Sequence, residues 1–434
     1  MYSKILIANR GEIAVRIIRA CKEMGIDSVA VYSQADAGTL HVALADESYC
    51  IGKPEAADSY LNPERIIGAA LASGAQAIHP GYGFLSENRE FAALCRKYGI
   101  AFIGPPAETM EKLGDKASVK RAMAEAGLAV IPGTGPLESA EDAAREAERL
   151  GYPVMLKSCL GGGGRGIRHV QSQSELAQAF AAAKAEATAA FGSCSIYMEK
   201  FIHPARHIEI QVLADEYGNV VCLGDRDCSI QQKRQKLVEE SPSPAVTDEQ
   251  RAEIFERVRE AVRKIDYHGA GTLEFLYDGK NFYFMEMNVR LQVEHTVTES
   301  LTGIDIVKWQ IRIASGVPLS FTQDDVDLRG SSIECRILAR QPGKVEFLHV
   351  PGGPFVRFDT YLTVGTQITP HYDPLIGKLI IYSGSREESL RKIRAALCEL
   401  VIDGVQTNIE EQLEIVSSKE FSSGSYNLDF LSGR

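Results

Sequence analysis

Hydrophobic and polar positions in the N-terminal part of the chain alternate between a strand pattern and a helix pattern. Residues 5–8 form an apolar run, residues 12–24 carry apolar side chains at helical spacing, and residues 28–32 form a second apolar run. This order predicts a strand–helix–strand unit with parallel strands. The turn at 9–12 lacks G-x-G-x-x-G, which disfavours a dinucleotide site there. Further strands are predicted at 77–79 and 101–104, and helices at 63–73 and 87–98.

The pattern changes after a turn cluster at 134–136. From Ile196 onward, short alternating runs predict β-hairpins and an antiparallel sheet, and short strands with Gly and Pro turns continue after residue 330. We therefore predict a mixed α/β and α+β fold. A small separate module is predicted before Ile196, from a helix at 140–150, a strand at 152–157, a glycine run and a long helix at 175–191.

Composition and charge narrow the class of protein. The chain has 434 residues, too long for one ordinary core, and its 45% hydrophobic and 24% charged residues are typical of a globular protein. The net charge of −11 disfavours nucleic acid as a partner. Nine scattered cysteines without C-x2-C spacing indicate reduced thiols. With no signal-peptide pattern and no long apolar stretch, we expect a cytoplasmic protein that does not bind membranes.

A strand ending in Lys157 runs into a glycine-rich segment that includes Gly162, Gly163 and Gly164. Glycine allows backbone N–H groups to approach phosphate oxygens closely and allows a loop to move. No Gly-Lys-Ser/Thr follows, so the segment is not a Walker A loop. A phosphate-binding loop is the favoured interpretation, and a flexible linker is the alternative.

Two acidic strands, at 272–277 and 282–288, flank an Asp-Gly turn and predict a β-hairpin. Counting outward from the turn places Glu274 and Glu286 within one residue of direct opposition, and Asn288 shares the face of Glu286. Opposed carboxylates among apolar residues repel each other unless a cation lies between them. Two carboxylates and an amide oxygen suit Mg²⁺. The alternative is a solvated polar face.

The next residues offer a possible anion site. If 288–295 is extended, Arg290, Gln292 and Glu294 lie on one side and His295 lies on the other, as a structural residue. A guanidinium, an amide and a carboxylate suit a small planar oxyanion such as bicarbonate, with Glu294 as the base.

Three other segments carry candidate chemistry. The strand 207–212 has a polar face of His207, Glu209 and Gln211, for which an exposed sheet face and a functional face are equally good interpretations. The charged segment 225–236 is either a solvated loop or a set of phosphate contacts. Residues 79–88 follow a strand and precede a helix, the place where ligands bind at the edge of a parallel sheet.

Taken together, the motifs resemble those of the biotin carboxylase family, in order and nearly from end to end. They are IANRGEIA (7–14), HPGYGFLSEN (79–88), GDK (114–116), MEKF (198–201), RHIEIQVLAD (206–215), DRDCS (225–229), QKLVEE (235–240), EMNVRLQVEH (286–295), ECRI (334–337), HYDPLIGKLI (371–380) and DGVQTN (403–408). The resemblance implies a Rossmann-like N-terminal domain (1–113), an ATP-grasp domain (114–330) with a mobile glycine-rich lid at about 130–200, and a C-terminal mixed β domain (331–434).

The resemblance also implies roles for individual residues. Glu274, Glu286 and Asn288 would hold Mg²⁺ or Mn²⁺. Arg290, Gln292 and the Val293 amide would hold bicarbonate, Glu294 would be its base, and Lys236 would position bicarbonate and the carboxyphosphate formed from it. Arg336 would stabilise the biotin enolate, with Tyr82 near biotin and bicarbonate. The residues expected around ATP are Lys116, Lys157, Gly162, Gly163, Gly164, Glu199, Lys200, His207, Gln231, Leu276 and Leu428.

The implied enzyme is an ATP-dependent ligase that forms a C–N bond on biotin, and it is a homodimer. No biotinylation motif is present, so the biotin carboxyl carrier protein and the carboxyltransferase are expected as separate chains, with acetyl-CoA as the commonest final acceptor and propionyl-CoA, pyruvate or urea as alternatives. The alternatives to this function are another acyl-phosphate-forming ATP-grasp enzyme and a non-catalytic nucleotide-binding subunit. The sequence departs from the family pattern at Leu160, Arg234 and Pro354 and in a shortened segment at 337–343.

Overall fold

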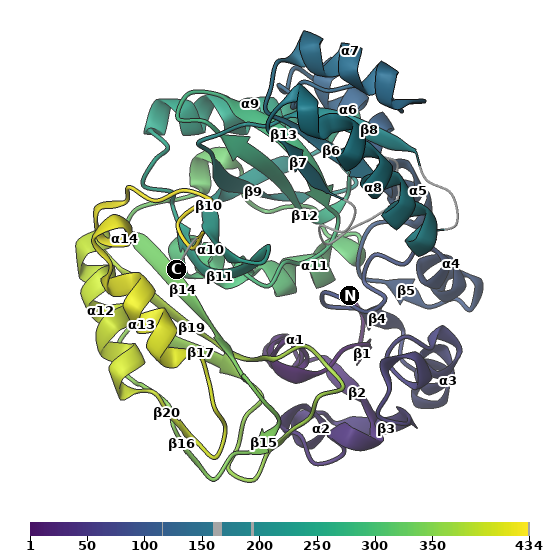
Figure 1. Cartoon of the computed structure of the whole chain (residues 1–434). Coiled ribbons are helices and arrows are strands. Elements are labelled where there is room, and N and C mark those ends of the chain that lie inside the picture. The colour runs from purple at the N-terminus through teal and green to yellow at the C-terminus, as the bar shows by residue number, and fades with distance from the viewer. Residues whose placement is uncertain (115, 159–166, 192–194, 433–434) are drawn as a thin grey trace.

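The computed structural model describes residues 1–114, 116–158, 167–191 and 195–432. At the N-terminus a five-stranded parallel sheet, with strand order β3-β2-β1-β4-β5, confirms the predicted strand–helix–strand beginning (Figure 1). Helix α1 (Gly11–Glu23) buries its apolar side chains Ile13, Ile17 and Ile18. The strands are β1 (Lys4–Ile7), β2 (Asp27–Ser33), β3 (Glu47–Gly52), β4 (Ala77–His79) and β5 (Ala101–Phe102), and the other helices are α2 (Leu40–Leu44), α3 (Pro63–Ser73), α4 (Arg89–Lys97), α5 (Ala107–Gly114) and α6 (Lys116–Glu125).

The centre of the molecule is an eight-stranded sheet with strand order β13-β12-β9-β10-β11-β14-β19-β17. Its strands are antiparallel neighbours, as the hairpin pattern after Ile196 predicts. The sheet continues across the predicted boundary at residue 330, because β11 pairs with β14. Its strands are β9 (Arg206–Ala214), β10 (Val220–Gln232), β11 (Gln235–Ser241), β12 (Gly269–Tyr277), β13 (Phe282–Asn288), β14 (Ser331–Leu338), β17 (Val356–Thr360) and β19 (Leu375–Ser383).

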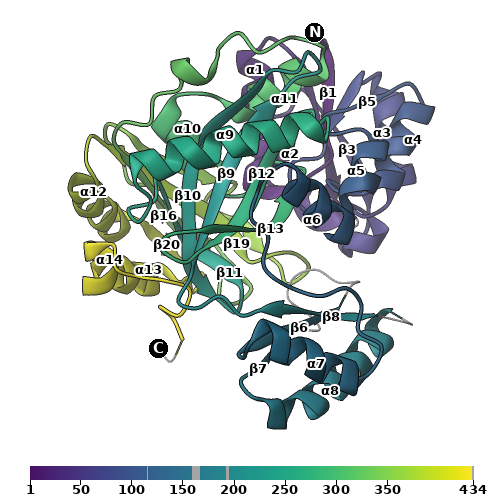
Figure 2. The same cartoon turned by 90° about the horizontal axis from the view of Figure 1, so that it is seen from above.

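A small module with its own three-stranded sheet and core stands apart from the rest of the molecule (Figure 2). Its strands are β6 (Val154–Ser158), β7 (Arg168–Val170) and β8 (Ile196–Lys200), and helices α7 (Ala140–Leu150) and α8 (Gln173–Phe191) cover them. The predicted separate module is therefore present. Leu160, Gly162, Gly163 and Gly164, in the predicted phosphate-binding loop, lie outside the described residues.

Helices and short ribbons complete the packing around the large sheet. Helix α9 (Asp248–Lys264) begins with a capping box between Thr247 and Gln250 and packs on β10. Among the described helices, none is long and apolar enough to cross a membrane. Besides short 3-10 helices at Gln34–Asp36, Ala56–Asp58 and Gln323–Asp325, the remaining described elements are α10 (His295–Thr302), α11 (Ile306–Ala314), α12 (Arg386–Glu399), α13 (Ile409–Ser417), α14 (Lys419–Ser423), and the ribbons β15 (Gly343–Lys344) with β18 (Gln367–Ile368) and β16 (Phe347–His349) with β20 (Val401–Asp403).

Two interpretations of the sequence need correction. The segment after Asn288 is not extended: β13 ends at Asn288, a turn forms at 293–294 and α10 begins at His295. The polar face of β9 is not a solvated sheet face either, because His207 is 7% exposed and Glu209 and Gln211 are 0% exposed. Both corrections matter for the site, since His207 and residues 290 and 292–294 line one cavity, and Glu209 bonds Lys236, which also lines it.

Candidate active site

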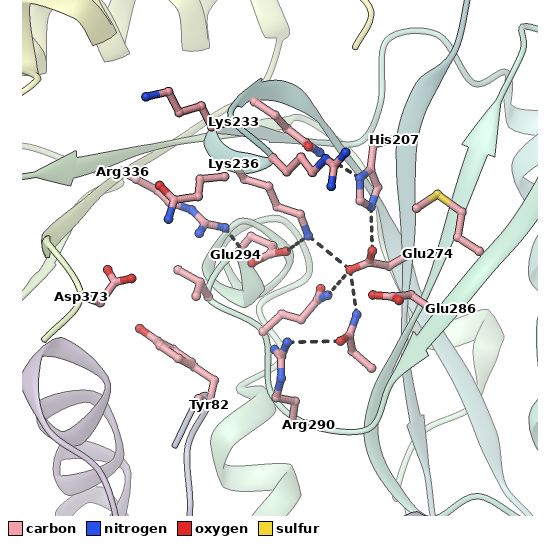
Figure 3. Close-up of a pocket in the computed structure, with 18 of the residues that line it drawn as sticks. Tyr82, His207, Lys233, Lys236, Glu274, Glu286, Arg290, Glu294, Arg336 and Asp373 are labelled. Atoms are coloured by element: carbon pink, nitrogen blue, oxygen red, sulfur yellow. Dashed lines mark hydrogen bonds and ion pairs between the residues drawn. The ribbon is translucent and has the colours of Figure 1, made fainter. Parts of the chain in front are cut away.

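A cavity of about 1140 Å³ lies between the N-terminal domain, the eight-stranded sheet and the β6–β8 module. Figure 3 shows Tyr82 from the N-terminal domain and side chains from the eight-stranded sheet, such as Lys236 and Glu274, pointing into it. The predicted site residues that line it are Tyr82, Lys157, Glu199, Lys200, His207, Gln231, Lys236, Glu274, Leu276, Glu286, Asn288, Arg290, Gln292, Val293, Glu294, Arg336 and Leu428. The side chain of Lys116 lies outside what the structure describes.

On one wall of the cavity, the acidic hairpin brings Glu274 and Glu286 directly opposite each other. The pairing shifts by one residue at Met285, and without this β-bulge Glu274 would face Met285 instead. Asn288 lies against Glu274, with its Nδ2 donating to Glu274 Oε1 at 2.7 Å. Two carboxylates and a side-chain amide therefore lie together on one wall of the cavity. This donor set fits a hard divalent cation such as Mg²⁺.

Lys236 reaches the middle of the cavity from β11 and connects the acidic groups on both sides (Figure 3). Its Nζ donates to Glu294 Oε1 at 2.6 Å and to Glu274 Oε1 at 3.3 Å, and it also bonds Glu209. His207 Nε2 lies 3.0 Å from Glu274 Oε2. The ammonium group thus occupies the space between Glu209 and Glu274.

Burial and charge together set the protonation of this wall. Burial lowers the pKa of His207, but the neighbouring Glu274 and Glu209 carboxylates outweigh it and raise that pKa to about 9. Burial raises the pKa of Glu274, and the charges of Lys236 and His207 outweigh this and hold it well below its usual range. At neutral pH His207 is therefore cationic and Glu274 is anionic.

The turn between β13 and α10 carries the predicted anion-binding residues. Although the segment is not extended, Arg290, Gln292 and Glu294 still converge on the cavity. Arg290 Nη2 donates to Asn288 Oδ1 at 3.2 Å, and Gln292 Nε2 donates to Glu274 Oε1 at 2.8 Å. The anion-binding group and the acidic hairpin are therefore in direct contact and form one site.

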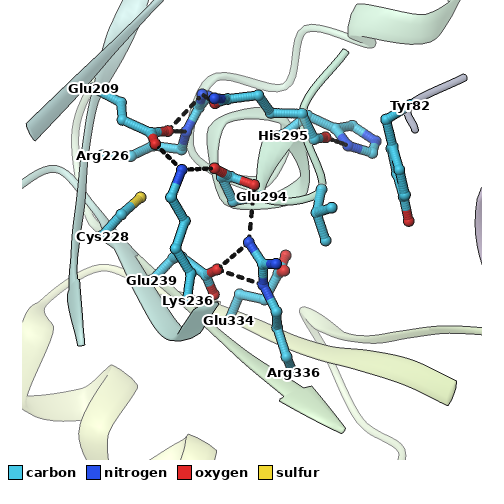
Figure 4. A network of polar contacts seen from close by, with 12 residues as sticks. Tyr82, Glu209, Arg226, Cys228, Lys236, Glu239, Glu294, His295, Glu334 and Arg336 are labelled. Atoms are coloured by element: carbon cyan, nitrogen blue, oxygen red, sulfur yellow. Dashed lines mark hydrogen bonds and ion pairs between the residues drawn. The ribbon is translucent and has the colours of Figure 1, made fainter. Parts of the chain in front are cut away.

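Glu294 lies between two cations, as Figure 4 shows. One carboxylate oxygen accepts from Lys236, and the other accepts from Arg336 Nη2 at 3.0 Å. Burial raises the pKa of Glu294, but the positive charges of Lys236 and Arg336 outweigh burial and lower the pKa below its usual value. The carboxylate is therefore ionised at neutral pH. Arg336 is also held by Glu239, with an Nε–Oε1 distance of 2.6 Å and an Nη2–Oε1 distance of 2.5 Å. This places an ionised base and an arginine side by side in the cavity.

Several of the residues that the resemblance places around ATP line the part of the cavity next to the β6–β8 module and β9. Glu199 on β8 is 2% exposed and pairs with Lys157 on β6. Lys200 donates to Gly151 O at 2.7 Å, and Gln231 Nε2 lies 2.9 Å from His207 Nδ1. Leu428 approaches from the C-terminal segment, where its backbone N–H donates to Ala205 O. Tyr82 contributes from the N-terminal domain, and its hydroxyl donates to Glu12.

Sequence reasoning missed several residues of this site. Lys120 lines the cavity and pairs with Glu199, and no local motif distinguishes it from other helical lysines. Lys378, on β19, is 0% exposed and donates to Val293 O at 2.8 Å. Arg226 was assigned to a segment that is either solvated or phosphate-binding, but it is fully buried in β10 and donates to five different residues: Glu209, Gln211, Thr272, Gln292 and Thr298.

Comparison with known proteins identifies the family. The family model "Biotin carboxylase, N-terminal domain" matches residues 1–110, "Carbamoyl-phosphate synthase L chain, ATP binding domain" matches 115–322, and "Biotin carboxylase C-terminal domain" matches 336–433. The biotin carboxylase of Haemophilus influenzae is 50% identical over 440 residues, covering 99% of this chain and 98% of that protein. The chain belongs to the biotin carboxylase family. The family predicted from the motifs is confirmed. The chain is an ATP-grasp ligase.

Solved structures of other biotin carboxylases have the same fold. The biotin carboxylase domain dimer of the Hydrogenobacter thermophilus 2-oxoglutarate carboxylase, in complex with MgADP, ADP and bicarbonate, is 48% identical with a TM-score of 0.94, covering 99% of this chain and 97% of that chain. A β-γ-ATP complex of the Campylobacter jejuni biotin carboxylase is 44% identical with a TM-score of 0.97, covering 100% and 99%. The predicted combination of a parallel sheet and an ATP-grasp core is confirmed.

Proposed function

We propose that this chain uses ATP and bicarbonate to carboxylate biotin held on a separate carrier protein. Biotin carboxylases use ATP, Mg²⁺ and biotin, and the H. thermophilus neighbour was solved with MgADP and bicarbonate. The observation that supports the proposal most strongly is the contact between two groups in one cavity. Gln292 of the anion-binding turn donates directly to Glu274 of the acidic hairpin.

Bicarbonate binds to the Arg290 guanidinium, the Gln292 amide and the Val293 N–H. Glu294, ionised and adjacent, removes the bicarbonate proton. The resulting oxyanion attacks the γ-phosphorus of ATP and forms carboxyphosphate with release of ADP. In the structure Lys236 bonds Glu294, so it lies where it can neutralise the charge that develops on the phosphoryl oxygens.

ATP binds in the end of the cavity formed by the β6–β8 module, among Lys157, Glu199, Lys200, His207, Gln231, Leu276 and Leu428. The proposed binding set also includes Lys116 and Gly162, Gly163 and Gly164. Glu274, Glu286 and Asn288 would hold Mg²⁺ or Mn²⁺. When bound, the ion neutralises part of the phosphate charge. Because carboxyphosphate reacts with water, the β6–β8 module acts as a lid over the cavity.

Carboxyphosphate then releases CO₂ and phosphate beside Arg336. The phosphate takes the biotin ureido proton, and the Arg336 guanidinium stabilises the enolate that captures CO₂. Glu239 contacts both Nε and Nη2 of Arg336, and Nη2 also bonds Glu294, so the two carboxylates together fix the orientation of the guanidinium. Tyr82 lies across the cavity from Arg336 (Figure 3), and it would contact biotin.

The partners follow from the chemistry of the complete reaction. A biotin carboxyl carrier protein and a carboxyltransferase act as separate chains, and acetyl-CoA is the proposed final acceptor, which would place the protein in fatty acid biosynthesis in the cytoplasm. One neighbour belongs to a 2-oxoglutarate carboxylase, so the identity of the partner carboxyltransferase decides the acceptor. The chain acts as a homodimer, as in that neighbour. The proposed domains are residues 1–113, 114–330 and 331–434.

ADP release tests this function. The purified protein is incubated with ATP, Mg²⁺ and bicarbonate, with and without free biotin, and ADP is followed by a coupled assay. We expect ADP release to depend on bicarbonate and to increase strongly with biotin. ADP release that responds to another carboxylic acid but not to bicarbonate would instead support a different ATP-grasp enzyme.

A further inference from the structure

Two successive carbonyl groups in the turn after β13 are held by buried side chains that contact the backbone. The Gln292 carbonyl accepts a hydrogen bond from His295 Nδ1 at 2.7 Å and a second from the His295 backbone N–H at 3.3 Å. The Val293 carbonyl accepts from Lys378 Nζ at 2.8 Å. Both side chains are 0% exposed. The turn that carries the anion-binding residues is therefore held on the side that faces the protein interior, away from the cavity.

The partners of His295 determine which ring nitrogen carries the proton. A carbonyl oxygen can only accept, so Nδ1 is the protonated nitrogen. Nε2 lies 3.8 Å from Glu299, whose carboxylate is already paired with Arg16 at 2.8 Å and Arg357 at 2.9 Å. Burial lowers the pKa of His295 to about 3, so the ring is neutral at physiological pH. The ring thus presents one N–H donor, and that donor is directed at the Gln292 carbonyl.

Peptide geometry carries this contact into the cavity. The Gln292–Val293 bond is not among the cis peptide bonds of the described residues, and in a trans peptide the C=O and N–H groups point in opposite directions. Because His295 holds the carbonyl on the protein side, the Val293 N–H points the other way. Val293 lines the cavity beside Arg290 and Glu294. Figure 4 shows His295 on the far side of the turn from Lys236 and Arg336.

We propose that His295 is a positioning residue for bicarbonate: its Nδ1–H clamps the Gln292 carbonyl and so aims the Val293 N–H into the anion site. Lys378 holds the next peptide in the same way and so fixes the backbone of Glu294. Lys378 is itself held by Glu12, at 3.1 Å. This inference rests on the proposed function, which assigns the Val293 N–H to bicarbonate.

Two substitutions separate this role from simple filling of the core. The side-chain amide of Asn places an N–H close to the position of Nδ1, whereas the amide of Gln places it close to the position of Nε2. His295→Asn keeps the donor to the Gln292 carbonyl, and His295→Gln removes it while remaining polar and of similar size. His41→Gln is the matched control, since His41 is also 0% exposed but lies outside the lining of the cavity.

Steady-state ADP release is measured with bicarbonate varied at saturating ATP, and then with ATP varied at saturating bicarbonate. We expect His295→Gln to raise KM for bicarbonate by about ten- to a hundredfold, as loss of one well-aligned donor to an anion does, with KM for ATP unchanged. His295→Asn should stay within about threefold of the parent for both substrates. His41→Gln should change neither KM.

Three results would overturn the proposal. The first is a KM for bicarbonate in His295→Gln that equals that of the parent. The second is that KM for bicarbonate and KM for ATP both rise, and rise equally in His295→Asn and His295→Gln. The third is failure of both variants to fold, because this position would then need the ring rather than its Nδ1 donor. A parent protein without bicarbonate-dependent ADP release would refute the proposed function as well, whereas an active parent with unaffected variants would refute only the role of His295.

Discussion

Replacing Glu294 by Gln removes the proposed base and little else. Glu294 bonds Lys236 at 2.6 Å and Arg336 at 3.0 Å. After Glu294→Gln, Lys236 keeps Glu209 and Glu274, and Arg336 keeps Glu239, so no buried cation loses all its partners. The loss of stability should therefore stay within the roughly 1.5–3 kcal/mol of a hydrogen bond to a charged group.

The loss of activity should be much larger than the loss of stability suggests. Removing a general base lowers the rate by about 10²–10⁴-fold, which corresponds to roughly 3–5 kcal/mol of barrier. We expect kcat for bicarbonate-dependent ADP release to fall by this factor, while ATP binding, measured by calorimetry, is unchanged. Glu334→Gln is the control: burial raises the pKa of Glu334 to about 8, so its carboxyl group is largely neutral at pH 7 and Gln imitates that form.

The decisive comparison is between these two variants. Turnover of Glu294→Gln within about tenfold of the parent would refute the assignment of Glu294 as the base, because a base contributes more than this factor. An equal loss of turnover in Glu334→Gln would show that the rate depends on the buried carboxyl groups in general rather than on Glu294 alone.

Three further predictions concern other parts of the molecule. Arg336→Met should abolish the stimulation of ADP release by free biotin while the slower bicarbonate-dependent release persists, and loss of both would contradict a role confined to the biotin step. Glu286→Gln should raise the Mg²⁺ concentration for half-maximal activity by about 10–100-fold, and an unchanged Mg²⁺ titration would exclude Glu286 as a ligand. Burial lowers the pKa of His41 to about 4, below its unfolded value of about 6.5. The buried neutral ring therefore contributes its full stabilisation above pH 6.5, and this contribution is lost as the pH falls towards 4. Thermal melting should therefore show a loss of up to about 3 kcal/mol over that range that is smaller in His41→Gln, and parallel curves would refute this contribution.

The sequence predicted elements well where a local pattern determines them. Helices at 63–73 and 140–150 and the strand at 77–79 have the predicted bounds, because turn residues and apolar spacing mark their ends. Helix α9 was not predicted, although its capping box and its buried Ile254, Val258 and Val262 at helical spacing carry the pattern.

Two features of the site depend on contacts between distant parts of the chain and could not be predicted from local sequence patterns. Counting from the Asp-Gly turn brings Glu274 within one residue of Glu286, but the bulge at Met285 that makes them direct partners has no local sequence pattern. The sequence alone places Arg226 in a charged segment and does not indicate that it is buried. The partners that accept its hydrogen bonds, such as Gln292 and Thr298, are distant in sequence, so no local pattern reveals them. The roles assigned to the individual site residues stay predictions until the variants are measured.

The sheet that runs unbroken from β13 to β17 limits how this enzyme can be taken apart or reshaped. Glu274 on β12 and Arg336 on β14 lie on strands of that one sheet, so one continuous sheet sets the spacing between the proposed phosphate and biotin steps. A cut between β11 and β14 would expose two unpaired strand edges, whereas the β6–β8 module has its own core. Hybrid enzymes should therefore exchange this module and inherit the sheet whole.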